Sequence, residues 1–208
     1  EVYIERMRRE YNVDVIVGEP KVAYRERPTK EVAFNFKHKK QTGGSGQYAH
    51  IVGKLRPLPE DSDVTFNFVN EISQGRIPRE YIPAVEQGFK RIMEKGPLCE
   101  CEVAGVEIVL EDGSYHEVDS SEMAFNVAGS MAFKSAAQKA QMALLEPIMK
   151  LEVITPSEFL GDVLADLNSR RAQIQNMEGE NETQVVNAFV PLAETFRYAT
   201  DLRSRTTG

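Results

Sequence analysis

The residues best suited to contact a polyanion lie in one basic, glycine-rich segment, residues 37–50. Apolar and polar residues alternate on both sides of it, which predicts a hairpin with this segment at its end. Residues 30–56 contain five lysines and Arg56 but one acidic residue, Glu31, which gives a net charge of +5. Lysines neutralise phosphates and release counterions, so this end suits a nucleic acid; a solvated hairpin end is the alternative. The candidate contact residues are Lys39, Lys40, Gln41, Thr42, Gly43, Gly44, Ser45, Gly46, Gln47 and Tyr48.

A second group of reactive side chains consists of His116, Asp119 and Ser120. Histidine, aspartate and serine are the residue types of nucleophilic hydrolases. However, Asp119 and Ser120 are adjacent, and Asp119 and Glu122 have the spacing of a helix capping box. We therefore expect a loop that precedes a helix, and no catalytic residue in this chain.

The two cysteines, Cys99 and Cys101, are two residues apart. We expect them on a strand, where such neighbours are poorly placed for an unstrained disulfide. With these cysteines and three histidines in all, no metal site is expected. A reducing cytoplasm fits this composition. No apolar run approaches the ~20 residues of a membrane helix, and no signal-like amino terminus is present.

The charge of the chain is unevenly distributed. The 208 residues are 41% apolar and carry a net charge of −7. Residues 57–124 contain 15 acidic and 5 basic residues, a net charge of −10. A negative protein does not bind nucleic acids indiscriminately, so we expect any contact with RNA to be local and oriented by the basic hairpin end.

The order of predicted elements indicates an α+β protein in three parts. Residues 1–18 contain a helix over 1–11 and a strand over 12–18, too little to bury a core, and we interpret them as the tail of a preceding domain. Residues 19–150 mix strands with a helix over 83–95, a turn at 111–114 and a second helix from Asp119 to about Leu145. Small residues in that second helix allow it to lie close to a sheet.

The third part, residues 151–208, predicts strand, helix, strand and helix in that order. Thr155 has the position of a helix cap, with Pro156 at the first helical position and Glu158 at the third. A split β-α-β sandwich needs one more strand. We therefore expect a fragment that is incomplete at both ends.

Six motifs, taken in order, resemble elongation factor G, the bacterial translocation GTPase. They lie at residues 40–48 (KQTGGSGQY), 77–85 (IPREYIPAV), 113–122 (GSYHEVDSSE), 145–149 (LEPIM), 189–194 (FVPLAE) and 198–204 (YATDLRS). Each motif alone is weak, but together they keep the order and approximate spacing of the family and cover nearly the whole chain.

The resemblance implies a fold for each part. Residues 1–18 would end the third domain of the family. Residues 19–150 would form its fourth domain, an elongated α+β domain whose β-α-β unit has a left-handed crossover. Residues 151–208 would form an incomplete ferredoxin-like fifth domain, an α/β sandwich.

The resemblance also implies a function: this fragment would contact transfer RNA and the decoding centre while the parent promotes GTP-dependent translocation of tRNA and mRNA. The second tip loop would add Ser114, Tyr115, His116 and Asp119 to the contact residues. No G-x-x-x-x-G-K-[ST] loop is present, so the GTPase domain, GTP and Mg²⁺ belong to the rest of the parent, and the fragment is expected to be neither an enzyme nor cofactor-dependent. Its implied partners are the small-subunit decoding centre, tRNA and mRNA, the large-subunit factor-binding region through the last domain, and ribosome recycling factor. A monomer without membrane contact is expected.

Three positions depart from the pattern of the family. Ser45 stands where the family usually has arginine, Ala49 where it usually has glycine, and Arg197 where it usually has glycine. Loss of an arginine removes a charged donor from the tip. These departures keep open a paralogue specialised in ribosome recycling, whereas the glycine-rich tip disfavours a protein of the tetracycline-protection type.

Overall fold

The computed structural model describes residues 9–10, 21–41 and 43–207. The described part of the chain divides into two compact units, one spanning Ala23–Glu146 and one containing residues 147–207. The helix expected over residues 1–11 and the strand expected over 12–18 lie outside the described residues, apart from residues 9 and 10, which are helical.

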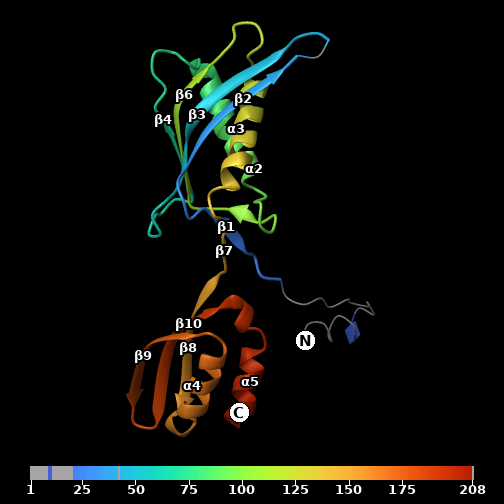
Figure 1. Cartoon of the computed structure of the whole chain (residues 1–208). Helices are drawn as coiled ribbons and strands as arrows, with labels where there is room; N and C mark the ends of the chain where they lie inside the picture. Colours follow the sequence, from blue (N-terminus) through green and yellow to red (C-terminus); the bar gives the residue numbers. More distant parts are fainter. Residues whose placement is uncertain (1–8, 11–20, 42, 208) are drawn as a thin grey trace. The chain divides into compact units, whose positions relative to one another are not determined.

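A four-stranded sheet forms the body of the first unit (Figure 1). Its strands, in spatial order, are β2 (Val32–Lys40), β3 (Gln47–Pro57), β6 (Val106–Ser114) and β4 (Phe66–Asn70). Neighbours are antiparallel, except that β4 runs parallel to β6. The short helix η1 (Arg79–Tyr81) and helix α2 (Ile82–Ile92) connect β4 to β6, which gives the expected β-α-β unit. The handedness of this crossover stays a prediction of the resemblance.

Helices α2 and α3 (Glu122–Ala137) pack together on one face of this sheet. Alternate strand residues, such as Phe34, Ile51 and Leu110, point into the same core as Phe89 and Phe125 of the helices. Polar residues occupy the intervening strand positions, which is the pattern of a sheet with one covered face. The core therefore fixes which side chains of β2 and β3 remain accessible.

Two glycines allow the two helices to touch through their backbones. An ideal Cβ on Gly88 would lie 2.2 Å from the carbonyl oxygen of Asn126, and one on Gly129 would lie 2.6 Å from that of Val85. Ser130 donates a 2.8 Å hydrogen bond to the carbonyl of Gly88 across the same contact. The small residues of α3 thus serve its approach to a helix as well as to the sheet.

A second, small sheet of the same unit has the order β5-β1-β7. Its strands are β5 (Glu102–Val103), β1 (Arg25–Arg27) and β7 (Ala143–Leu145). Cys99 and Cys101 lie in the turn before β5, not on a strand as predicted, and they form a disulfide. Glu100 between them has a φ of 56°, so the turn brings the two Cα atoms to 5.1 Å, which is within the range of disulfides.

The second unit is a three-stranded antiparallel sheet covered by helices α4 (Leu160–Ser169) and α5 (Tyr198–Arg205) (Figure 1). Its strands have the order β8 (Ile148–Pro156), β10 (Thr183–Pro191), β9 (Gln173–Glu180). Short helices η2 (Ser157–Phe159) and η3 (Leu192–Glu194) precede α4 and α5. The element order β-α-β-β-α lacks one strand of a split β-α-β sandwich. The mixed α+β class is confirmed.

Arg170 joins the two helices of this unit. Its guanidinium donates to Asp166 of α4 at 3.1 Å and to Asp201 of α5 at 2.6 Å. The same group lies 4.9 Å above the ring of Tyr198 and also donates to the carbonyl of Glu194. The carboxylate of Asp166, which is 5% exposed, thus pairs with Arg170 through Oδ2, and Nε of Arg205 lies 3.6 Å from its Oδ1.

Several predicted boundaries are wrong, each for a local reason. Residues 111–114 continue strand β6 instead of forming a turn, because they pair with β3 as far as His50. Ser121, not Asp119, caps α3, since its hydroxyl accepts from the amide of Ala124 at 3.1 Å. Helix α3 ends at Ala137 rather than near Leu145, and β7 follows it. Thr155 is buried in β8 and caps no helix.

Candidate nucleic-acid interface

The predicted hairpin is present, and its register places the basic residues at its end. β2 and β3 pair without interruption from Val32 and Leu55 to Lys40 and Gln47. Lys39 and Lys40 are exposed, and the loop residues Gln41, Gly43, Gly44 and Ser45 beyond them are exposed as well. Gly43 has a φ of 47°, a conformation that glycine adopts without strain. Thr42 lies outside the described residues.

Part of the positive charge counted in the sequence is neutralised within the sheet. Arg56 pairs with Glu107, and Lys54 pairs with Glu111 at 3.4 Å, both across to β6. A hydrogen bond from Asn67, together with Arg56, lowers the pKa of Glu107, which keeps its carboxylate charged. The cationic character of the hairpin end therefore comes from Lys37, Lys39 and Lys40.

The second loop, predicted over Gly113–Asp119, begins after Ser114 because residues 113 and 114 belong to β6, and it lies against the start of β3. The amide of Tyr48 donates to the carbonyl of Asp119 at 2.9 Å. The hydroxyl of Ser120 donates to the carbonyl of Tyr48 at 2.7 Å and accepts from the amide of His116 at 2.9 Å. An ideal Cβ on Gly46 would lie 3.0 Å from the carboxylate of Asp119, so the absence of a side chain at Gly46 permits this approach.

The two loops together line a hollow of about 370 Å³. His116 offers a ring that is 57% exposed and lies 3.6 Å from the carboxylate of Asp119, measured from its Nδ1. The ring centroid of His116 is 6.2 Å from that of Tyr48. A base or ribose could contact the hollow through lysine, amide and aromatic groups at once, as RNA-binding surfaces do. Its lining residues are Lys39, Lys40, Gln41, Gln47, Tyr48, His116 and Asp119.

Two separate sets of hydrogen bonds hold Tyr48 and Gln47, which both line the hollow. Tyr48 Oη and Ser114 Oγ are 2.8 Å apart, and Ser114 Oγ is 2.8 Å from Nδ1 of His50. The other ring nitrogen of His50 lies 2.7 Å from Oδ1 of Asn35, and His38 Nε2 lies 2.8 Å from Oε1 of Gln47. Ser114 was predicted to contact RNA, but its hydroxyl is bound within this network.

The pKa of His50 is lowered from its ordinary value, mainly by burial and secondarily by the nearby charge of Lys37. A neutral ring can donate from Nε2 to Asn35 and accept at Nδ1 from Ser114, and Ser114 can in turn accept from Tyr48. The lowered pKa of His50 and its hydrogen-bond pattern both indicate a neutral imidazole. His50 therefore orients the tip without adding charge to it.

Sequence reasoning missed His38, His50, Asn35 and Ser120 as supporting residues. Their roles depend on strand register and on the contact between loops, which no local motif reports. Of the second-loop residues, His116 and Asp119 line the hollow, whereas Tyr115 is exposed and is not among its lining residues. Cross-strand position, for instance His50 opposite Ser114, is the signal that could have found the network.

His116, Asp119 and Ser120 do not form a nucleophilic triad. The hydroxyl of Ser120 donates to the carbonyl of Tyr48, and its contact with His116 is to the backbone amide rather than to the ring. A serine nucleophile needs a hydrogen bond to the ring of its base. The three residues are therefore an element of loop structure.

Among the described residues, the group of potential metal ligands is Glu26, Cys99 and Cys101, and none of these belongs to either loop. Within the same part of the chain, no helix is both long and apolar enough to cross a membrane.

Two family models match the chain in succession. Residues 20–141 match the model described as elongation factor G, domain IV, and residues 143–208 match the one described as elongation factor G C-terminus. The chain belongs to the elongation factor G family. The resemblance of the six motifs is thereby confirmed.

Individual relatives agree with this family. Elongation factor G of Rhodopirellula baltica is 55% identical over 208 residues, elongation factor G 2 of Bdellovibrio bacteriovorus is 53% identical over 209, and elongation factor G of Pseudothermotoga lettingae is 52% identical over 208. Each comparison covers all of this chain and 30% of the relative. A crystal structure of a Thermus thermophilus protein is similar with a TM-score of 0.88 at 43% identity, again over all of this chain and 30% of the other.

The chain thus spans about 30% of the length of the elongation factors G that it matches. It corresponds to domain IV and the C-terminal region of the family. These relatives identify it as part of a translation elongation factor.

Proposed function

We propose that this chain is the part of an elongation factor G that contacts transfer RNA and the decoding centre during translocation. The observation that carries the proposal is that the end of the β2–β3 hairpin, which bears the lysines, and the loop that contains His116 line one hollow. Lys39 and Lys40 would neutralise phosphates, and Gln41 and Gln47 would bond bases or 2′-hydroxyl groups.

The remaining activities of such a factor belong to the rest of the protein. GTP and Mg²⁺ would bind outside this chain, which has no phosphate-binding loop motif. The second unit would support contact with the large subunit. The protein would act in the cytoplasm as a monomer, with the ribosome and its tRNA and mRNA as partners.

The proposal is tested by toeprinting with the full-length elongation factor that carries this chain. On pretranslocation ribosomes with GTP, the unchanged protein is expected to advance the mRNA by one codon. Replacing Lys39, Lys40 and His116 with alanine is expected to slow that advance at least tenfold, because each substitution removes a contact made at the tip. Lys134→Ala, on the exposed side of α3, is the matched control and is expected to leave the rate unchanged.

Two results would contradict the proposal. One is an unchanged rate in the triple variant, provided that its circular dichroism shows it to be folded. The other is the absence of any codon advance by the unchanged protein together with subunit splitting in the presence of ribosome recycling factor. The latter would make the protein a recycling paralogue, an alternative that no observation here favours.

A further inference from the structure

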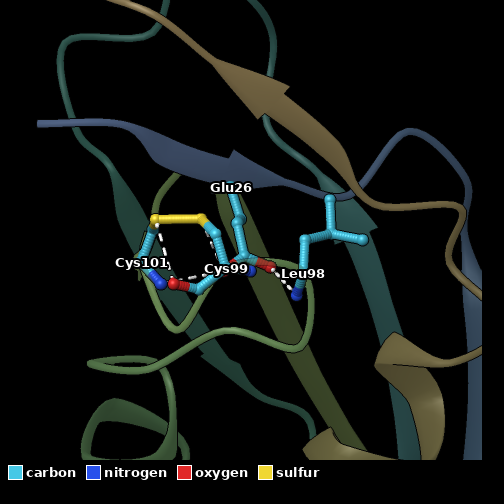
Figure 2. Close-up of a disulfide and its surroundings, with 4 residues drawn as sticks. All are labelled: Glu26, Leu98, Cys99 and Cys101. Carbon is cyan, nitrogen blue, oxygen red and sulfur yellow. Dashed lines mark hydrogen bonds between the residues drawn. A yellow bond between two sulfur atoms is a disulfide. The ribbon is translucent and has the colours of Figure 1, made fainter. Parts of the chain in front are cut away.

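The turn that carries the two cysteines wraps around a buried carboxylate (Figure 2). Glu26 of β1 is 0% exposed, and its carboxylate accepts from the amides of Leu98 at 2.7 Å, Cys101 at 3.1 Å and Cys99 at 3.4 Å. Within the described residues, its partners are these amides and not a lysine or arginine side chain. A carboxylate removed from water is stabilised by such bonds but keeps its preference for a nearby cation.

The backbone of the turn is built to admit this carboxylate. An ideal Cβ on Gly96 would lie 2.3 Å from Oε2 of Glu26, so any other residue there would collide with the carboxylate. The amide of Gly96 donates to the carbonyl of Cys101 at 2.7 Å, which closes the turn independently of the sulfur atoms. This backbone hydrogen bond, and those from the amides of Cys99 and Cys101 to Glu26, involve no sulfur atom and are available to the reduced turn as well.

Both sulfur atoms lie beside the carboxylate. Sγ of Cys99 is 3.6 Å from Oε2 of Glu26, and one ligand atom from each of the three residues lies within 4.8 Å of the others. Cys99 is exposed and Cys101 is half-buried, so a reductant or an ion can reach the sulfurs from solvent. One side of the site is protein and the other is open.

We propose that the reduced turn binds a thiophilic divalent cation of the Zn²⁺ class through Cys99, Cys101 and Glu26, with water as the fourth ligand. Tetrahedral Zn²⁺ with ligand bonds of about 2.0–2.3 Å places its ligand atoms roughly 3.3–3.8 Å apart. The 3.6 Å between Cys99 and Glu26 already fits this spacing. Thiolates select Zn²⁺ over Mg²⁺ or Ca²⁺, which prefer oxygen ligands.

The sulfurs can serve either the disulfide or the cation. A dithiol that reduces the disulfide supplies two electrons and two protons, yields two cysteine thiols and is itself oxidised to a disulfide. Each thiol then releases its proton to water when its sulfur binds the cation. The site is therefore expected to bind only under reducing conditions, and this inference does not depend on the proposed RNA contacts.

The test uses the whole chain, reduced with dithiothreitol and freed of it by anaerobic desalting. Cd²⁺, a spectroscopic substitute for Zn²⁺, is titrated in while thiolate-to-metal absorption in the ultraviolet is followed. We expect one Cd²⁺ per chain in the reduced protein and no such absorption in the oxidised protein. Cys99→Ser and Cys101→Ser are each expected to weaken binding at least tenfold. Glu102→Gln, which removes an exposed carboxylate next to Cys101, is the control and is expected to bind as the unchanged chain does.

The role of Glu26 is tested in two ways, because a buried substitution can prevent folding. Glu26→Gln, if folded by circular dichroism, is expected to bind at least tenfold more weakly. X-ray absorption of the Zn²⁺ form of the unchanged chain is expected to show two sulfur and two oxygen neighbours. Four sulfur neighbours with one ion per two chains, or unchanged binding by the Cys101→Ser variant, would overturn the proposal.

Discussion

The hydroxyl of Ser120 holds the two tip loops together, because it bonds both to the carbonyl of Tyr48 and to the amide of His116. Ser120→Ala leaves these two groups without that partner. We expect the free energy of unfolding to fall by about 1–2 kcal/mol, as is usual when a hydrogen-bonding hydroxyl is removed and its partners remain. Urea unfolding measures this change. Ser135→Ala, on the exposed side of α3, serves as the control, and an equal loss in both variants would refute the role of Ser120.

His50 is expected to make the stability of the first unit depend on pH. Its pKa is lowered in the folded chain by burial and by Lys37, so the unfolded state binds the proton more readily. The stabilising effect of the neutral ring is present above pH ~6.5, the ordinary value for histidine, and is lost as the pH falls through the folded-state pKa. Urea unfolding at several pH values between 8 and 5 is expected to show this loss in the unchanged chain and a shallower dependence in His50→Gln. An identical slope in both proteins would count against the network.

Among individual residues, those that line the hollow could be predicted from the sequence, whereas those that hold the lining residues in place could not. Lysine and glycine content marked the hairpin end directly. The partner of His50 could not be predicted, because it required the register that places His50 opposite Ser114. Glu26 was missed for a similar reason, since it lies more than 70 residues before the turn that it holds.

At the scale of elements, the contact between α2 and α3 depends on glycines. Gly88→Ala would place a methyl group 2.2 Å from the carbonyl oxygen of Asn126, a backbone atom that cannot move without its helix. We expect a loss of about 1–3 kcal/mol in the free energy of unfolding, the usual cost of overpacking. Gly161→Ala, whose Cβ would meet nothing within 4 Å, is the matched control and is expected to be neutral or slightly stabilising. Thermal unfolding of both variants, followed by circular dichroism, measures the change in stability. An equal change in the two variants would contradict the role of Gly88.

The elements that the sequence predicted well are those with a strong periodic pattern, such as α2 and the β2–β3 hairpin. Strand β9 was missed because its sequence, QIQNMEGE, contains few apolar residues. The pairing of β9 with β10 supplies the structure that its own residues do not specify. The turn predicted at residues 111–114 was wrong because Gly113 is needed inside strand β6 and does not mark a turn. It fits between the backbone of His50 and the side chain of Ile77, where a Cβ would lie 2.3 Å and 2.5 Å from their atoms.

For the molecule as a whole, charge distribution governs how it approaches a polyanion. The chain carries −7 in total, so its basic hairpin end must act against the repulsion of the remainder. We expect ribosome affinity of the full-length factor to fall with rising salt concentration. Replacing Lys39 and Lys40 with glutamine is expected to reduce the slope of log affinity against log salt by about 1–2, since each lost phosphate contact removes roughly 0.7–0.9. Binding measured across a range of KCl concentrations tests this, and an unchanged slope would exclude phosphate contacts by these lysines.

Strand β3 has a mechanical property that follows from its position between β2 and β6. Its inter-strand hydrogen bonds lie perpendicular to the strand direction. A push on the hairpin end along β3 therefore loads these bonds in shear, and many bonds resist together instead of opening one after another. Because the second loop is hydrogen-bonded to Tyr48, a force on His116 is passed to the same strand. The tip would resist compression along the strand far better than it would resist peeling of β2 from its neighbour.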